Sequence, residues 1–171
     1  MSAPTSYSWA RSATFVVSGT AQPGATVELF DGSTSFGTTT VSITGAWSRM
    51  ITVLGDGAYL LTARTRNAGG TSPSSGIRVV QVDTRAPAVP VLTAPTGAVA
   101  TSFTLTGTAE AGTTVEVFEN GSSRGTVAAG SGTWTKAFSG VARGTCNYTA
   151  VATDMAGNRS LISSARTLTV G

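Results

Sequence analysis

An internal duplication constrains the fold of this chain more than any other feature of its sequence. Residues 15–38 match residues 103–126 at an offset of 88 positions without a gap, and 12 of the 24 aligned residues are identical. The 171 residues are therefore two copies of one unit, because a repeat of this length usually forms one structural module. Units of this size bury only about 60–65% of the surface of their unfolded chain. We therefore expect two modest hydrophobic cores.

Within each copy, short β-rich runs are separated by turn signals. Residues 26–30 and 114–118 place apolar side chains at the two-residue period of a strand. Asp31-Gly32 and Asn120-Gly121 are typical of the tight turns that join neighbouring strands. Evenly spaced short strands in a unit of this length predict a β-sandwich.

Two prolines, Pro87 and Pro90, lie between the copies. Proline fixes a backbone angle and has no N–H group for a sheet, so continuous strand pairing is not expected there. We expect one domain over residues 1–83, a short and semi-rigid linker over residues 84–90, and a second domain over residues 91–171.

The copies resemble the bacterial immunoglobulin-like domains that occur in tandem in large surface adhesins. The resemblance rests on residues 18–30 and 106–118, and on a Gly-x-Trp element at Trp47 and again at Trp134. It covers nearly the whole chain and implies an all-β fold of two tandem immunoglobulin-like β-sandwiches joined by a short proline-containing linker. It implies no particular ligand, because many functions share this fold.

The composition argues against several classes of function. Without histidine, imidazole catalysis is impossible and most zinc sites are excluded. Ten Arg and one Lys stand against eight acidic residues with no basic cluster, so we expect no nucleic-acid binding. No apolar run of about 18 residues occurs, so we expect no membrane insertion. We expect a protein that is not an enzyme and has no cofactor.

Four residues with distinctive chemistry have a structural and a functional interpretation. Trp47 and Trp134 occupy equivalent positions in the two copies, which favours core packing over sugar stacking. Trp9 has no counterpart, and it is either a docking residue in an N-terminal arm over residues 1–13 or a core residue of the first strand. The lone Cys146 is expected to be a small buried side chain on a strand, with a reactive thiol as the alternative.

Three polar residues could also be interpreted as calcium ligands. In adhesins of the resembling family, acidic residues at repeat junctions bind Ca²⁺, which makes Asp83, Asp154 and Asn158 candidate ligands. A calcium ion needs six to eight oxygen ligands, and few acids are present. Asp154 and Asn158 are equally typical of a tight turn closed by their own side chains.

These observations favour a structural or adhesive function. The chain begins at Met1 without the charged and apolar pattern of a secretory signal. Our leading hypothesis is an accessory protein on the surface of a phage virion, such as a capsid decoration or head fibre. It would dock on the major capsid protein or another virion protein and bind cell-surface glycans weakly. The alternatives are a stalk segment of a secreted bacterial adhesin, at the cell surface or extracellular, and a carbohydrate-binding module, which predicts an exposed row of aromatic side chains.

Overall fold

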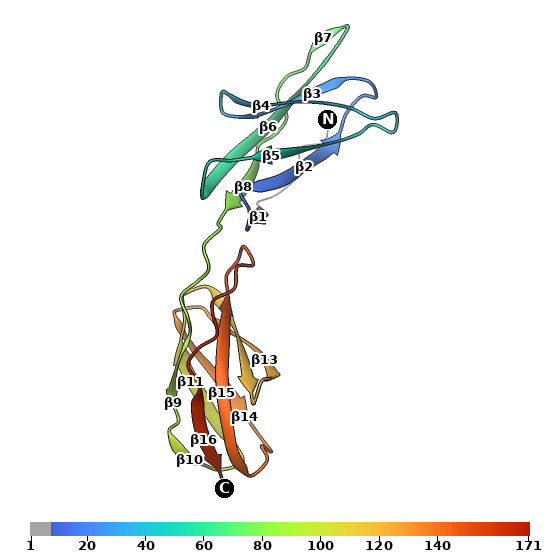
Figure 1. The fold of residues 1–171 in the computed structure, drawn as a ribbon. Helices are drawn as coiled ribbons and strands as arrows, with labels where there is room; N and C mark the ends of the chain where they lie inside the picture. Colours follow the sequence, from blue (N-terminus) through green and yellow to red (C-terminus); the bar gives the residue numbers. More distant parts are fainter. Residues whose placement is uncertain (1–7) are drawn as a thin grey trace. The chain divides into compact units, whose positions relative to one another are not determined.

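A computed structural model describes residues 8–171, which consist of strands, turns and loops. The chain divides into two compact units, Met1–Thr84 (unit 1) and Arg85–Gly171 (unit 2), and each has the two-sheet form of a β-sandwich (Figure 1). The prediction of an all-β fold with two tandem sandwiches is confirmed. Residues 8–171 contain no helix with the length and apolar character that a membrane span requires.

Unit 1 has eight strands within its described residues. They are β1 (Ser8–Ala10), β2 (Thr14–Thr20), β3 (Thr26–Asp31), β4 (Thr34–Thr40), β5 (Ala46–Thr52), β6 (Gly57–Asn67), β7 (Gly70–Thr71) and β8 (Arg78–Val82). The larger sheet has the order β1-β8-β6-β3-β4, with β7 paired to β6. The smaller sheet pairs β2 with β5.

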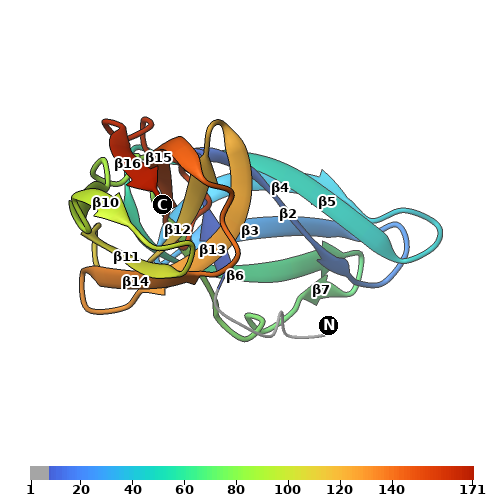
Figure 2. The ribbon, with the colours of Figure 1, turned by 90° about the horizontal axis from the view of Figure 1, so that it is seen from below.

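Unit 2 has the same plan with one further strand in its smaller sheet. Its strands are β9 (Val91–Ala94), β10 (Gly97–Val99), β11 (Phe103–Thr108), β12 (Thr113–Glu119), β13 (Ser122–Ala129), β14 (Thr133–Phe138), β15 (Gly144–Thr153) and β16 (Arg166–Val170). The larger sheet has the order β10-β16-β15-β12-β13, and the smaller sheet has the order β14-β11-β9. In Figure 2 the two layers of unit 2 are visible, with β11 and β14 below β15 and β16.

Each unit has its own hydrophobic core between its sheets. On β3, Val27 and Leu29 point inward while Glu28 and Phe30, which alternate with them, face outward, and a half-buried sheet produces this alternation. Trp47 is 7% exposed in the core of unit 1 and Trp134 is 2% exposed in the core of unit 2. The predictions of two separate cores and of two core tryptophans are confirmed.

No strand forms over residues 83–90, as the two prolines predict. Residues 85–90 group with unit 2. The backbone N–H of Ala88 donates to Glu110 Oε2 at 3.1 Å, and the side chain of Pro90 is fully buried. The segment immediately before β9 therefore packs as part of the second unit.

Candidate functional site

The outward face of the larger sheet gathers polar and aromatic side chains in both units. On β3 the alternation that buries Val27 and Leu29 turns Glu28 and Phe30 outward. The duplicated sequence repeats the arrangement on β12, where Glu116 and Phe118 face outward. These open faces are the candidate functional surfaces.

In unit 1 the open face forms a shallow hollow of about 350 Å³ between β3, β4 and β6. The Arg64 guanidinium lies 5.5 Å from the centre of the Phe30 ring, within cation–π range. Arg64 Nε also donates to Ser74 Oγ at 2.9 Å. Glu28 accepts a hydrogen bond of 2.6 Å from the Ser35 hydroxyl. A carboxylate, a guanidinium and an aromatic ring thus share one accessible surface.

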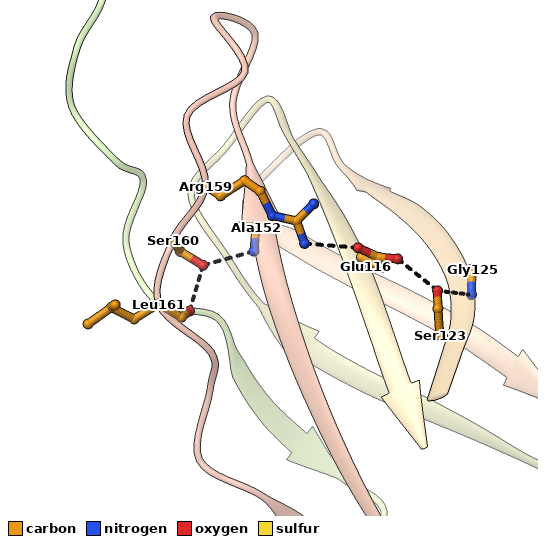
Figure 3. Close-up of polar contacts among 7 residues, drawn as sticks. All are labelled: Glu116, Ser123, Gly125, Ala152, Arg159, Ser160 and Leu161. Carbon is orange, nitrogen blue, oxygen red and sulfur yellow. Dashed lines mark hydrogen bonds and ion pairs between the residues drawn. The ribbon is translucent and has the colours of Figure 1, made fainter. Parts of the chain in front are cut away.

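In unit 2 the same face carries an ion pair (Figure 3). Arg159 Nη2 lies 3.0 Å from Glu116 Oε2, and the Ser123 hydroxyl donates to Glu116 Oε1 at 2.7 Å. The Ser123 hydrogen bond and, after it, Arg159 hold the pKa of Glu116 below its usual value. Glu116 is therefore a carboxylate at neutral pH, which suits it to accept hydrogen bonds and not to act as a general acid.

Ser160 fixes the segment from which Arg159 reaches Glu116 (Figure 3). Its hydroxyl accepts the backbone N–H of Ala152 at 2.9 Å and donates to the carbonyl oxygen of Leu161 at 2.8 Å. The first contact ties the segment that follows β15 back to that strand, and the second lies within the segment itself.

A second group of chemically distinctive side chains is buried inside unit 2. Tyr148 is fully buried, and the thiol of Cys146 donates to Glu119 Oε1 at 3.7 Å. Burial and, secondarily, the charge of Glu119 raise the pKa of Tyr148 well above its usual value. Cys146 is 5% exposed on β15, opposite Leu168, as Tyr59 lies opposite Val80 in unit 1. The prediction of a small buried side chain at Cys146 is confirmed.

The structure places the calcium candidates in two different units. Asp154 and Asn158 form a tight turn that is closed by two hydrogen bonds between them. The backbone N–H and the side-chain amide of Asn158 donate to the two carboxylate oxygens of Asp154, each at 2.9 Å. Asp83 lies at the end of unit 1, where its backbone N–H donates to Ala10 O at 2.9 Å. Within residues 8–171 no three His, Cys, Asp or Glu side chains gather into a group that could hold a metal. The calcium site stays a prediction.

Trp9 lies on β1, opposite Gln81 of β8, and its side chain is 37% exposed. It borders a hollow of about 180 Å³ formed by β1, β2 and β8. Both interpretations of Trp9 keep support, because it belongs to the first described strand and remains accessible. Residues 1–7 of the predicted N-terminal arm lie outside the described residues.

The sequence interpretation did not predict the outward faces of the larger sheets as candidate functional surfaces, although part of the sequence indicates them. The alternation on residues 26–30 that predicts a strand also places Glu28 and Phe30 on one side of it. Arg64 and Arg159 carry no such signal, because they approach these residues from distant positions in the chain. A carbohydrate-binding module predicts a row of exposed aromatic residues, and Trp47 and Trp134 are not part of such a row because both are buried.

No protein-family model matches the chain, and no curated protein matches it. Similar solved structures include the fibronectin(III)-like modules of CbhA from Clostridium thermocellum, with a TM-score of 0.66 and 20% identity over 98% of this chain and 90% of that one. The FN1–FN3 domains of chicken CNTN1 align with a TM-score of 0.56 and 11% identity over 91% of this chain and 61% of that one. At these identities the likeness shows the fold alone. The chain is thus an all-β protein of two tandem immunoglobulin-like β-sandwiches, of the kind that fibronectin(III)-like modules share.

Proposed function

We propose that this chain is a non-enzymatic structural and adhesive protein displayed on a surface. Its setting would be a phage virion, as a capsid decoration or head fibre. In this proposal one unit docks on the major capsid protein or another virion protein, and the other binds cell-surface glycans weakly. The observation that carries the proposal is the pairing of polar groups on the open sheet faces, which leaves contact surfaces and no reactive centre.

The titratable groups support a role without catalysis. Active sites usually collect groups whose pKa values are moved toward the working pH. Here the pKa of Glu116 is lowered and that of Tyr148 is raised, so both move away from neutrality. Tyr148 is also sealed inside the core, where no substrate reaches it.

The hollow of unit 1 supports weak glycan contact. Sugars are bound through hydroxyl groups that pair with carboxylate, hydroxyl and guanidinium groups, and through apolar faces that rest on aromatic rings. Glu28, Phe30, Thr38 and Arg64 supply this combination around the hollow. Its shallow form fits contacts that are individually weak and become effective when many copies are displayed.

Binding to glycans and to host cells tests the adhesive part of the proposal. The full chain is immobilised in many copies and incubated with a glycan array and with host cells, beside the variants Phe30→Ala and Arg64→Ala. Phe118→Ala is the matched control, because the sheet position equivalent to Arg64 in unit 2 is Val151. Binding that falls with the unit 1 variants and persists in the control supports the proposal, and no binding by the multivalent wild-type chain contradicts it.

Mass spectrometry of purified phage particles whose genome encodes the chain tests the virion setting. A fixed copy number per particle, with matching density in cryo-microscopy, is the expected result. Particles that lack the chain would contradict the virion part of the proposal, but they would not contradict the adhesive function.

A stalk in a secreted bacterial adhesin is the second candidate, and the 88-residue duplication favours it. Stalks are built by repeating one module many times. Further repeats of the same length in the gene would favour the stalk over the virion protein. A gene with such repeats would encode a surface adhesin, and the chain would then be extracellular or at the cell surface.

A further inference from the structure

Two arginines on the open face of unit 1 have no counterpart at the equivalent positions of unit 2. Arg64 and Arg66 point outward from β6 and line the hollow between β3, β4 and β6. On β15 the equivalent residues are Val151 and Thr153. Among the described residues that line the hollow, Glu28 is the only carboxylate. The hollow of unit 1 therefore carries a net positive charge, which favours anionic ligands.

Two contacts hold the guanidinium of Arg64 in place. Its Nε donates to Ser74 Oγ at 2.9 Å, and the guanidinium lies 5.5 Å from the centre of the Phe30 ring. Within residues 8–171, neither Nη atom of Arg64 has a hydrogen bond or an ion pair. A guanidinium that is already oriented loses less freedom when it binds an anion. The two Nη groups are thus oriented donors that are available to a ligand.

Arg66 extends the positive surface away from Glu28. Glu28 lies opposite Arg64 in the sheet, whereas Arg66 lies opposite Thr26, two positions further along β6. Residues two positions apart on one face of a strand are separated by about 7 Å. Arg66 is exposed, and in the described part of the chain it has no hydrogen bond or ion pair. An anion is therefore repelled least by Glu28 at the Arg66 end of the hollow.

A second hollow, of about 430 Å³, adjoins the first one at this end of β6. Thr65 and Thr71 line both hollows. The second hollow is polar, with the side chains of Gln22, Asn67 and Ser72 on its surface. The side-chain amide of Asn67 donates to Gln22 Oε1 at 2.9 Å, so the amide N–H groups of Gln22 are left for a ligand.

The two hollows together match a short chain of sugars in which one sugar carries a carboxylate. Guanidinium groups bind carboxylates through paired, charge-assisted hydrogen bonds. Sugar hydroxyl groups pair with amide and hydroxyl groups such as those of the second hollow. An acidic peptide fits less well, because none of the described residues that line the second hollow is aliphatic or aromatic and could receive an apolar side chain.

We propose that the open face of unit 1 binds an acidic oligosaccharide. The carboxylate of one sugar lies between Arg64 and Arg66, and the neighbouring sugar lies in the second hollow against Gln22 and Asn67. This inference rests on the glycan binding proposed above and names the class of glycan. Salt should weaken the binding, because ions in solution screen exposed charges.

A glycan array with matched glycans tests the proposal. The full chain, displayed in many copies, is applied to sialylated and uronic-acid glycans, to their methyl esters, and to neutral and sulfated glycans with the same backbone. Methyl esterification removes the charge of the carboxylate and keeps the shape of the sugar. We expect binding to the carboxylated glycans, and a loss of about tenfold for their methyl esters, as for other hydrogen bonds to charged groups.

Variants of Arg66 test the assignment of the site. Arg66→Gln removes the charge at an exposed position and should weaken binding to the carboxylated glycans about tenfold. Arg66→Lys keeps the charge but lacks the paired donors, so its binding should be intermediate. Arg143→Ala, at an exposed arginine in unit 2, is the matched control and should bind as the wild-type chain does. Equal binding by the wild-type chain and Arg66→Gln would overturn the proposal.

The other outcomes separate this inference from the adhesive function. Equal binding to carboxylated glycans and to their methyl esters, or binding to neutral glycans alone, would overturn the inference and leave the adhesive function supported. A preference for sulfated glycans would overturn the assignment of a carboxylate. Absence of binding to every glycan would contradict both. Amide NMR shifts on titration with the carboxylated glycan should appear along β6, and shifts confined to unit 2 would also overturn the inference.

Discussion

The indole of Trp134 lies directly against Gly107, its partner across β11 and β14, and a Cβ at position 107 would overlap the ring. Gly19 and Trp47 repeat the relationship in unit 1, where a Cβ at position 19 would come within 2.7 Å of the indole. The absence of a side chain at these glycines makes room for the largest residue of each core. This packing explains why both copies have glycine at this position.

We expect Gly107→Ala to destabilise unit 2 by about 2–3 kcal/mol, because overpacking a filled core forces its neighbours to move. The added methyl group would also overlap the carbonyl oxygen of Val91, a backbone atom that cannot turn aside. Gly19→Ala should destabilise unit 1 by less, because the atoms nearest to the added methyl group belong to the Trp47 side chain and not to the backbone. Amide hydrogen exchange, which reports each unit separately, measures both changes.

Gly130→Ala is the matched control, since a Cβ there meets nothing within 4 Å. It should leave the free energy of unfolding of unit 2 nearly unchanged. Equal losses of stability for the substitutions at positions 19 and 107 would mean that the Val91 carbonyl contributes nothing.

The core could be predicted from the sequence because each copy repeats it. Trp47 and Trp134 occur at equivalent positions, and local alternation is enough to turn strand residues inward. The Glu116 to Arg159 contact could not be predicted, because it joins residues 43 positions apart and depends on how the segment after β15 folds back.

Burial of Cys146 should protect its thiol from reagents in solution. The side chain is 5% exposed inside unit 2, so modification requires local opening of the sandwich. With a chromogenic disulfide reagent we expect slow labelling of the native chain and immediate labelling in urea. Thr126→Cys, at an exposed position on β13, supplies a reactive control in the Cys146→Ser background. Fast stoichiometric labelling of native Cys146 would instead support the reactive-thiol alternative.

Acid should weaken unit 2 partly through Glu116. Its pKa is lower in the folded chain than the usual 4.5, so ionised Glu116 contributes stability above that value, and the contribution is lost as the pH falls through the folded pKa. The group is near solvent, so we expect a few tenths of a kcal/mol, as for other exposed pairs. Ser123→Ala should raise the Glu116 pKa more than Arg159→Gln does, because the Ser123 hydrogen bond is the larger cause.

Carbon-detected NMR titration of the Glu116 carboxyl group measures these shifts. Glu28→Gln is the control for the acid unfolding curve, because Glu28 has the equivalent serine contact in unit 1 and should leave the unfolding of unit 2 unchanged. A Glu116 pKa that stays the same in both variants contradicts the assignment of its causes.

At high pH the hydroxyl group of Tyr148 should ionise only when unit 2 unfolds. The ring is fully buried, with the rings of Phe103 and Phe138 edge-on at 5.7 and 5.2 Å, so burial first and the Glu119 charge second raise its pKa. In the unfolded chain a tyrosine ionises near pH 10. Neutral Tyr148 therefore contributes fully to the stability of unit 2 below about pH 10, and this contribution is lost progressively as the pH rises further.

A jump to higher pH tests this expectation. We expect one step in tyrosinate absorbance, at the rate at which unit 2 unfolds. The step should be absent in Tyr148→Phe and retained in Tyr59→Phe. Immediate ionisation of Tyr148 with the amides of β15 still protected would show that the buried ring is accessible and that this account of its pKa is wrong.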